Sequence, residues 1–151
     1  KLYFYPLSSK VENKLEEIFK SLIGINKVKV NEIEILQRKI KTVKSSKGVV
    51  WFDFKEICDS PRSSLDFIEI SKEFQTVIIS NMFKIKSDDI ARRFISLIDE
   101  CYDRKVKVII SAENNFKEIY EGSNLKEKFK RTISRLIEMQ SVDYLKEAHK
   151  A

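Results

Sequence analysis

Histidine and cysteine are scarce in this 151-residue chain, and both scarcities exclude classes of chemistry. The sequence holds one histidine and two cysteines. Its histidine, His149, stands beside the C-terminus, so acid–base catalysis built on histidine has almost nothing to work with. Cys58 and Cys101 lie far apart without Cys-x-x-Cys spacing. We therefore expect no metal site and no disulfide framework, and a reducing compartment is the simpler interpretation.

Glycine is also scarce, and the three glycines, Gly24, Gly48 and Gly122, are isolated from one another. A phosphate loop needs the pattern G-x-x-x-x-G-K-[ST], so this motif is absent. The first buried-type apolar run, 76–80, is not followed by the Asp-Glu pair that would hold Mg²⁺ and orient a water. We therefore expect this chain alone to bind neither ATP nor Mg²⁺ and to be inactive as an ATPase.

Long apolar runs are missing as well. No run approaches the roughly 18 residues of a membrane span, and there is no secretory signal, so we expect no membrane span and a cytoplasmic protein. The composition, 42% hydrophobic and 34% charged, is that of a globular domain with its own core. We expect residues 1–151 to form a single domain. Because the chain begins at Lys1 without a methionine, we also expect it to be a fragment of a longer protein.

The net charge of +6 is distributed unevenly. Residues 26–47 hold seven lysines and arginines against two glutamates, on a segment that reads as a β-hairpin. Such a patch suits nucleic-acid binding, but no aromatic side chains are interleaved with its lysines, and lysines also protect an exposed sheet edge. Nucleic acid is therefore the least favoured partner. Trp51 and Phe52, just beyond the patch, are interpreted as core residues.

The N-terminal segment, 1–60, is expected to combine a helix with the basic hairpin. Apolar spacing predicts a helix over 8–24, with a serine cap at Ser8 or the next residue. Residues 31–54 alternate like half-buried strands, with a turn at 45–48.

The middle segment, 61–115, has a different pattern. It predicts a helix over 63–74, a buried strand over 76–80, a helix over 88–105 and a second buried strand over 106–111. Strand, helix and strand in this order make a βαβ unit with parallel strands and a right-handed crossover.

The C-terminal third, 116–151, is predicted to be helical. It reads as a short helix over 116–122 and a longer one over 125–150. The fold class is therefore α/β, with α+β as the alternative.

Four arginines are the candidate site residues. Arg92 and Arg93 are adjacent, so they point about 100° apart around their helix, and at least one should border its buried stripe. A snorkelling arginine is the favoured interpretation there, and a guanidinium aimed at a phosphate or at a partner's carboxylate is the alternative. Arg131 and Arg135 lie four residues apart in an apolar helix. They either sense a phosphate or a neighbouring subunit, or they tie helices together by ion pairs, with Glu138 as a plausible partner of Arg135.

Three acidic residues on the middle helix, Asp99, Glu100 and Asp103, raise the question of a metal site. Asp99 and Asp103 share a helix face, but Arg104 and Lys105 follow closely. A charge network at the end of the helix is therefore the favoured interpretation.

Specific motifs then point to a family. Three stretches occur in order, WFDFKEICDSPRSSLDFIEIS, DDIARRFISLIDECYDRKVKVIISAE and FKRTISRLIEMQSVDYLKEAH, after LYFYPL near the start. Together they closely resemble the C-terminal half of the ZapE/Afg-like ATPases, which are P-loop proteins related to the AAA+ class. The resemblance covers nearly the whole chain, and the PRSS and IISAE stretches are nearer to its bacterial branch.

The resemblance implies ATP hydrolysis with Mg²⁺ in the parent protein. It also implies a role in cell division through FtsZ or other divisome components, at the division site, or a mitochondrial place in the eukaryotic branch. Self-association is a further expectation. The phosphate loop belongs to the family's N-terminal half, so no nucleotide-binding residue can be carried over. Within this chain, Ser80 and Asn81 stand where an acidic pair would stand if the βαβ unit is a degenerate echo of the ATPase core. The alternative function is a non-enzymatic interaction domain.

Overall fold

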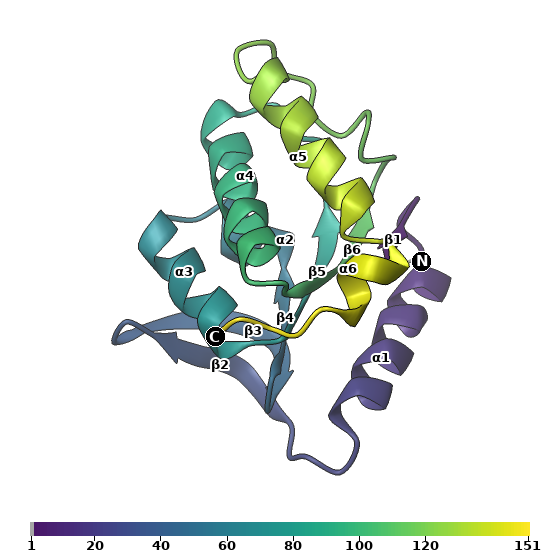
Figure 1. Cartoon of the computed structure of the whole chain (residues 1–151), viewed down its shortest axis with the longest axis vertical. Helices are drawn as coiled ribbons and strands as arrows, with labels where there is room; N and C mark the ends of the chain where they lie inside the picture. Colours follow the sequence, from purple (N-terminus) through teal and green to yellow (C-terminus); the bar gives the residue numbers. More distant parts are fainter. Residues whose placement is uncertain (1) are drawn as a thin grey trace.

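The structure is a computed structural model, which describes residues 2–151. It contains a six-stranded sheet and helices that lie on both of its faces (Figure 1). The elements in chain order are β1 (Tyr3–Phe4), α1 (Ser9–Ile23), β2 (Lys29–Ile35), β3 (Arg38–Ser46), β4 (Val49–Asp53), α2 (Phe54–Cys58), α3 (Ser64–Glu73), β5 (Thr76–Met82), α4 (Asp88–Asp103), β6 (Lys107–Ala112), α5 (Lys126–Glu138) and α6 (Val142–Lys146).

The strand order in the sheet is β1-β6-β5-β4-β3-β2. The four strands from β1 to β4 in this order are parallel, and β3 and β2 extend the sheet as an antiparallel hairpin. β5, α4 and β6 form the predicted βαβ unit, with its two strands adjacent and parallel. The predicted α/β fold class is thus confirmed.

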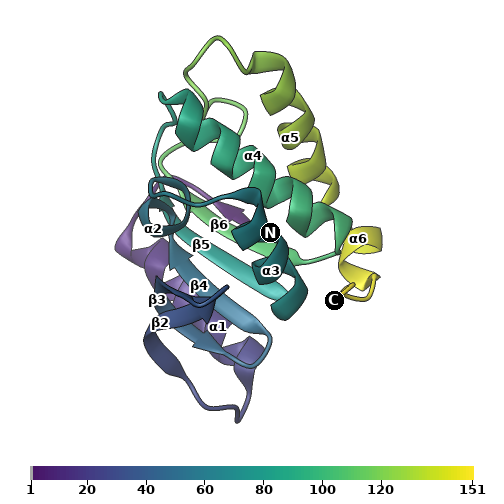
Figure 2. The same cartoon turned by 90° about the vertical axis from the view of Figure 1, so that its left-hand side faces the viewer.

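Side chains alternate between the two faces of the central strands, as the period of a strand requires. On β4, Val50 and Phe52 join the core under α2, α3, α4 and α5, whereas Val49 and Trp51 pack beneath α1. Figures 1 and 2 show α4 between α3 and α5 on the first face, and α1 on the opposite face. Within residues 2–151, α1 is the only helix of that second face. The sheet is therefore covered thickly on one side and thinly on the other.

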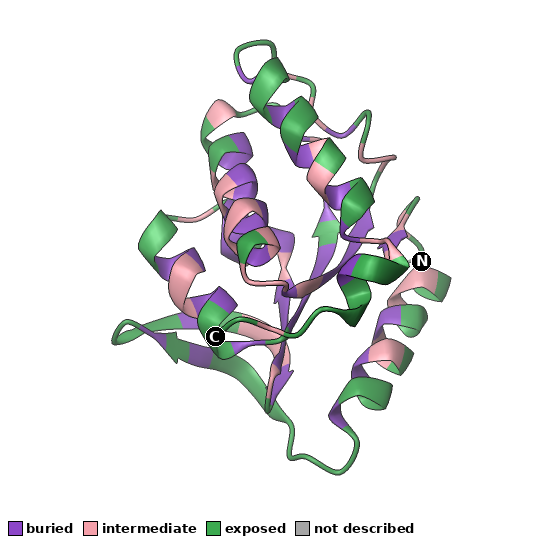
Figure 3. Cartoon of the chain, in the orientation of Figure 1, coloured by how far each residue is buried: buried purple, intermediate pink, exposed green. Residues whose placement is uncertain are grey.

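Trp51 and Phe52 are fully buried, which confirms their interpretation as core residues. Trp51 lies 6.0 Å from the ring of Phe19 on α1, centroid to centroid, and its indole Nε1 donates a hydrogen bond of 3.0 Å to Ser80 Oγ. Figure 3 shows the same division along the chain, with buried central strands and an exposed hairpin tip.

The predicted short helix over 116–122 is wrong, because this segment forms turns and then an isolated parallel bridge between Ile85 and Tyr120. The side chain of Asn115 accepts a hydrogen bond from the backbone N–H of Lys117, and the Ile85 N–H donates to the Ile119 carbonyl at 2.8 Å. Asparagine competes with helical hydrogen bonding in this way, so the local turn displaces the helix.

The predicted single helix over 125–150 is also wrong, because it is broken into α5 and α6. Ser141 is extended, and its hydroxyl accepts from the backbone N–H of Tyr144 at 3.2 Å, which caps α6. A serine that starts a new helix interrupts the old one. The residues after Lys146 are not helical.

Asp66, on α3, is a fully buried carboxylate that the sequence pattern does not single out. It caps its own helix by accepting from the Ser63 backbone N–H at 3.0 Å, and it forms an ion pair with Arg38 of β3. Burial alone would raise the pKa of this carboxyl group. The hydrogen bonds from Arg38 and Ser63, with the charges of Arg38 and Arg62, outweigh burial and lower the pKa. Asp66 therefore joins the basic hairpin to α3.

Replacing Asp66 by Asn should lower the free energy of unfolding by about 1–2 kcal/mol, because a charged acceptor becomes neutral while its cap geometry is kept. Since the folded pKa of Asp66 is depressed, its contribution is present above the unfolded value of about 3.9 and is lost as pH falls below it. Urea unfolding from pH 7 to 2.5, followed by Trp51 fluorescence, measures both effects. Asp103→Asn on the exposed side of α4 is the control. An Asp66→Asn variant as stable and as pH-dependent as the parent chain would contradict the assignment.

Candidate functional site

The α4–α5 interface holds two of the four candidate arginines. Phe94 of α4 stacks on Phe129 of α5, with 6.1 Å between ring centroids. Leu136, two turns further along α5, is also buried. Beyond this apolar contact, Asp99 of α4 faces α5. A carboxylate at the edge of an apolar interface can form ion pairs with arginines of the facing helix.

Arg135 has this carboxylate as its ion-pair partner. Its Nη1 forms an ion pair with Asp99 Oδ1, and each of the two side chains is 26% exposed. The guanidinium also lies over the ring of Tyr102, with Cζ 4.8 Å from the ring centroid. A planar guanidinium suits both contacts at once. Arg135 therefore joins α5 to α4 by a half-buried ion pair and a stacked contact.

Arg131 approaches the same carboxylate more loosely. Its Nη2 is 3.8 Å from Asp99 Oδ2, and its side chain is 59% exposed. An exposed pair at this distance contributes little to stability. Of the two arginines on α5, Arg131 is the one whose charge faces solvent.

Arg92 and Arg93 lie apart from this pair, nearer the start of α4. Arg93 donates through Nη1 to the Cys58 carbonyl at 3.1 Å, so it borders the buried stripe as predicted for one of the two. Arg92 is 59% exposed and pairs with Asp89 of its own helix at 3.3 Å. The structure brings Arg131 and Arg135 together at Asp99 and leaves Arg92 and Arg93 in separate local contacts.

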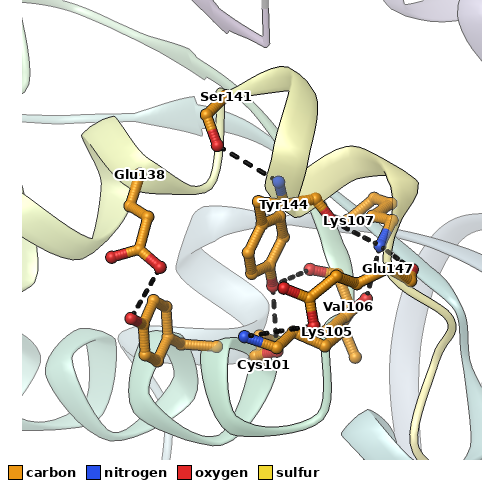
Figure 4. Close-up of polar contacts among 9 residues, drawn as sticks. Cys101, Lys105, Val106, Lys107, Glu138, Ser141, Tyr144 and Glu147 are labelled. Carbon is orange, nitrogen blue, oxygen red and sulfur yellow. Dashed lines mark hydrogen bonds and ion pairs between the residues drawn. The ribbon is translucent and has the colours of Figure 1, made fainter.

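The prediction that Glu138 is the partner of Arg135 is wrong. Glu138 instead accepts a hydrogen bond of 2.8 Å from the Tyr102 hydroxyl (Figure 4). This hydrogen bond raises the pKa of the Tyr102 phenol. An ion pair that is partly shielded from water and stacked on a ring is stronger than an exposed pair within one helix. Arg135 therefore pairs with Asp99 of α4 instead of Glu138 of its own helix.

The acidic residues of α4 form a charge network, as favoured from the sequence. Glu100 accepts from Arg104 at 2.8 Å, but the partners of Asp99 come from α5 instead of the helix end. Among residues 2–151, no group of histidine, cysteine, aspartate and glutamate side chains could hold a metal ion.

Tyr144 fastens α6 to the turn between α4 and β6 (Figure 4). Its buried hydroxyl donates toward the carbonyls of Val106 at 2.7 Å and Cys101 at 3.2 Å. Lys107 Nζ donates to the backbone carbonyls of Tyr144 and Glu147, at 3.2 and 2.7 Å. Burial raises the pKa of Tyr144 and lowers that of Lys107. These contacts hold the end of the chain against the start of β6, a role that the sequence did not reveal.

The carboxyl ends of β4 and β5 are where an open α/β sheet usually binds its ligand. Here Ser80 accepts from Trp51, and the side-chain amide of Asn81 donates to Asp53 Oδ2 at 2.9 Å. Asp53 also caps α2 through its other oxygen. The hydroxyl and amide groups at this edge are occupied by neighbours and do not fit a Mg²⁺–nucleotide site. That the βαβ unit is a degenerate copy of part of an ATPase core stays a prediction. It requires β5 and β6 to be parallel, and this requirement is confirmed.

The basic hairpin is partly neutralised within the chain. Arg38 pairs with Asp66, Lys39 with Glu32 at 3.4 Å, and Lys44 with Glu16 of α1 at 2.5 Å. These pairs favour a structural role for the hairpin charges. Within the part of the chain that the structure describes, no helix has both the length and the apolar character needed to cross a membrane.

Known proteins match this chain along nearly its whole length. The family model of the AFG1-like ATPases matches residues 1–148. The Escherichia coli cell division protein ZapE is 36% identical over 153 residues, which cover 99% of this chain and 40% of ZapE. An uncharacterised protein of Schizosaccharomyces pombe is 35% identical over 122 residues, covering 78% of this chain and 27% of its own length.

A zebrafish protein, lactation elevated protein 1 homolog B, is 25% identical over 182 residues, covering 95% of this chain and 36% of its own. No solved structure matches the chain. The chain thus spans two-fifths or less of the length of these relatives. The extent of the family match and the identity to ZapE confirm the resemblance carried by the motifs. This chain belongs to the AFG1-like ATPase family.

Proposed function

We propose that this chain is the C-terminal part of a ZapE-like ATPase, in which it completes the fold and supplies a partner surface. In this proposal the preceding part of the polypeptide binds ATP and Mg²⁺ and hydrolyses the nucleotide. One observation supports it above all. Nearly the whole chain matches ZapE yet covers 40% of it, and the sequence holds no phosphate loop. The 151 residues act in this proposal as one domain.

The partner in this proposal is the division machinery. ZapE is by name a cell division protein. The parent of this chain would act at the cytoplasmic division site by contacting FtsZ or another divisome component. Co-sedimentation of the full-length protein with FtsZ filaments tests the contact, and its failure at low and moderate salt would remove FtsZ as the partner.

Among the four candidate arginines, Arg131 is the one we assign to a phosphate or a neighbouring subunit. Arg135 is held by Asp99 and Tyr102, and Arg93 by the Cys58 carbonyl. Arg92 is as exposed as Arg131, but it lies closer to its carboxylate, at 3.3 Å from Asp89 of its own helix. Arg131 is exposed and only loosely paired. Arginines that reach toward phosphates in related chemistry stabilise the charge that develops on the transferred group.

Replacing Arg131 by Ala in the full-length ATPase should lower ATP turnover at least about tenfold. The variant should keep its unfolding midpoint, because a loosely paired exposed arginine contributes little to stability. Steady-state phosphate release measures the first quantity and urea unfolding the second. Lys130→Ala, which removes the neighbouring exposed charge on α5, is the matched control.

Unchanged turnover in the Arg131→Ala variant would favour the second candidate function. In that case this part of the protein is a non-enzymatic interaction domain whose arginines only join helices. The contacts of Arg135 and Arg93, both made inside the chain, favour this alternative for those two residues.

A further inference from the structure

The thinly covered face of the sheet carries an apolar groove beside α1. Its volume is about 520 Å³. α1 forms one wall, β1 and β6 form the floor, and α6 closes one end. The apolar side chains that line it are Leu2, Phe4, Ile18, Leu22, Ile109 and Leu145.

Apolar side chains at this groove remain in contact with solvent. Leu22 is 44% exposed and Leu145 38% exposed. Sheets of parallel strands are normally covered on both faces. A contiguous apolar surface of this kind marks an interaction site. The opposite face, under α2 to α5, shows how such strands are covered elsewhere in the same sheet.

We propose that this groove receives an apolar segment of the nucleotide-binding half of the same polypeptide. The inference rests on the proposed function, in which that half precedes Lys1. More than half of the length of ZapE lies outside the matched region. Leu2 itself lines the groove, and its carbonyl accepts from the Ile110 N–H at 2.9 Å. A chain that leads into β1 thus arrives at the groove wall, and this tether gives the preceding segment a high effective concentration there.

The lysines at the groove indicate what charge a segment that binds there should carry. Lys14 lines the groove, and Lys10 and Lys14 line the adjoining hollow at the start of α1 together with a single carboxylate, Glu17, so positive charge is in excess there. An incoming segment should therefore carry carboxylates beside its apolar residues. A second copy docked by the same face would set two surfaces with the same excess of positive charge against each other, which is unfavourable. The structure thus favours an apolar segment with acidic neighbours over a two-fold contact between copies.

Cross-linking of the full-length protein tests the proposal directly. A zero-length carbodiimide reagent joins lysines to carboxylates in direct contact, and mass spectrometry identifies the sites. A mixture of isotope-labelled and unlabelled protein separates links within one polypeptide from links between two. We expect Lys10 or Lys14 to be joined to carboxylates that precede Lys1 in the same polypeptide. The link from Lys130 to Glu127, which lie 3.1 Å apart on α5, is the internal control.

A charge placed in the groove should weaken the same contact. Leu22→Asp should lower the yield of those cross-links about tenfold, because it places a carboxylate where a leucine would be buried and repels the acidic segment. Leu65→Asp, at a 64% exposed leucine of α3, should leave the yield unchanged. Thermal unfolding followed by circular dichroism verifies that both variants keep the fold of the parent protein.

The outcomes separate the inference from the proposed function. Links found only between copies would overturn the inference, as would the absence of links from Lys10 and Lys14 while the Lys130–Glu127 link forms. Equal yields for Leu22→Asp and Leu65→Asp would also overturn it. A full-length protein without ATP turnover would contradict the proposed function. The cross-linking result would still show whether the two halves pack together at the groove.

Discussion

Replacing Trp51 by Ala should lower the free energy of unfolding by about 3–5 kcal/mol, among the larger effects that a single core substitution produces. Trp51 is fully buried, packs against Phe19 of α1 and donates to Ser80. Its removal leaves a cavity between the sheet and α1, which is the only helix on that face within residues 2–151. The effect should therefore combine lost burial with a loosened α1.

Urea unfolding followed by circular dichroism measures this change, because Trp51 is the only tryptophan and its fluorescence is lost in the variant. Trp51→Phe keeps a ring against Phe19 but removes the donor to Ser80, so it should cost less, about 1–2 kcal/mol. Ile25→Ala, at a fully exposed residue, should change stability by less than about 0.5 kcal/mol. A Trp51→Ala variant within 1 kcal/mol of the parent chain would show that α1 is not held through this residue.

Much of the fold could be predicted because its elements carry strong local signals. The α1 helix has a serine cap at Ser8, a clear apolar stripe and a glycine at its end, and it forms where predicted. β5 and β6 are continuous apolar runs separated by a capped helix, so their parallel pairing follows from connection rules. These features depend on residues that are close in sequence.

The missed elements depend on distant partners or on turn chemistry. β1 holds two residues and exists because Tyr3 and Phe4 pair with Ile110 and Ser111, more than a hundred positions away. No periodicity can be read from two residues. The segment that follows β6 has apolar residues at helical spacing, but Asn115 turns the chain before a helix can form. Local hydrogen bonding outweighs periodicity at such positions.

The candidate site could be predicted only in part. The sequence singled out Arg131 and Arg135, and it raised the possibility that they join helices. It could not identify Asp99 as their shared partner, because the packing of α5 against α4 decides which of several carboxylates they meet. Tyr144 and Asp66 carried no signal beyond an aromatic and a helix-start carboxylate. Their roles come from contacts with Val106 and Arg38, respectively.

Replacing Asp99 by Ala should lower the free energy of unfolding by about 2–3 kcal/mol, since it leaves the half-buried Arg135 without its carboxylate. The expected cost lies below that of a fully buried pair because both side chains are 26% exposed. Urea unfolding of Asp99→Ala, Arg135→Ala and the double variant gives the coupling free energy of the pair. We expect a coupling of about 1–2 kcal/mol.

The exposed pair between Asp89 and Arg92, also on α4, is the matched control, and its coupling should be below about 0.5 kcal/mol. Equal couplings for the two pairs would contradict the bracing role of Arg135. ATP turnover of the same variants in the full-length protein then separates bracing from phosphate sensing. If Arg135 only braces α5 against α4, removing Asp99 lowers turnover as much as removing Arg135, because either change releases the same helix. If Arg135 itself reaches a phosphate, Arg135→Ala lowers turnover further than Asp99→Ala, since the latter variant keeps the guanidinium.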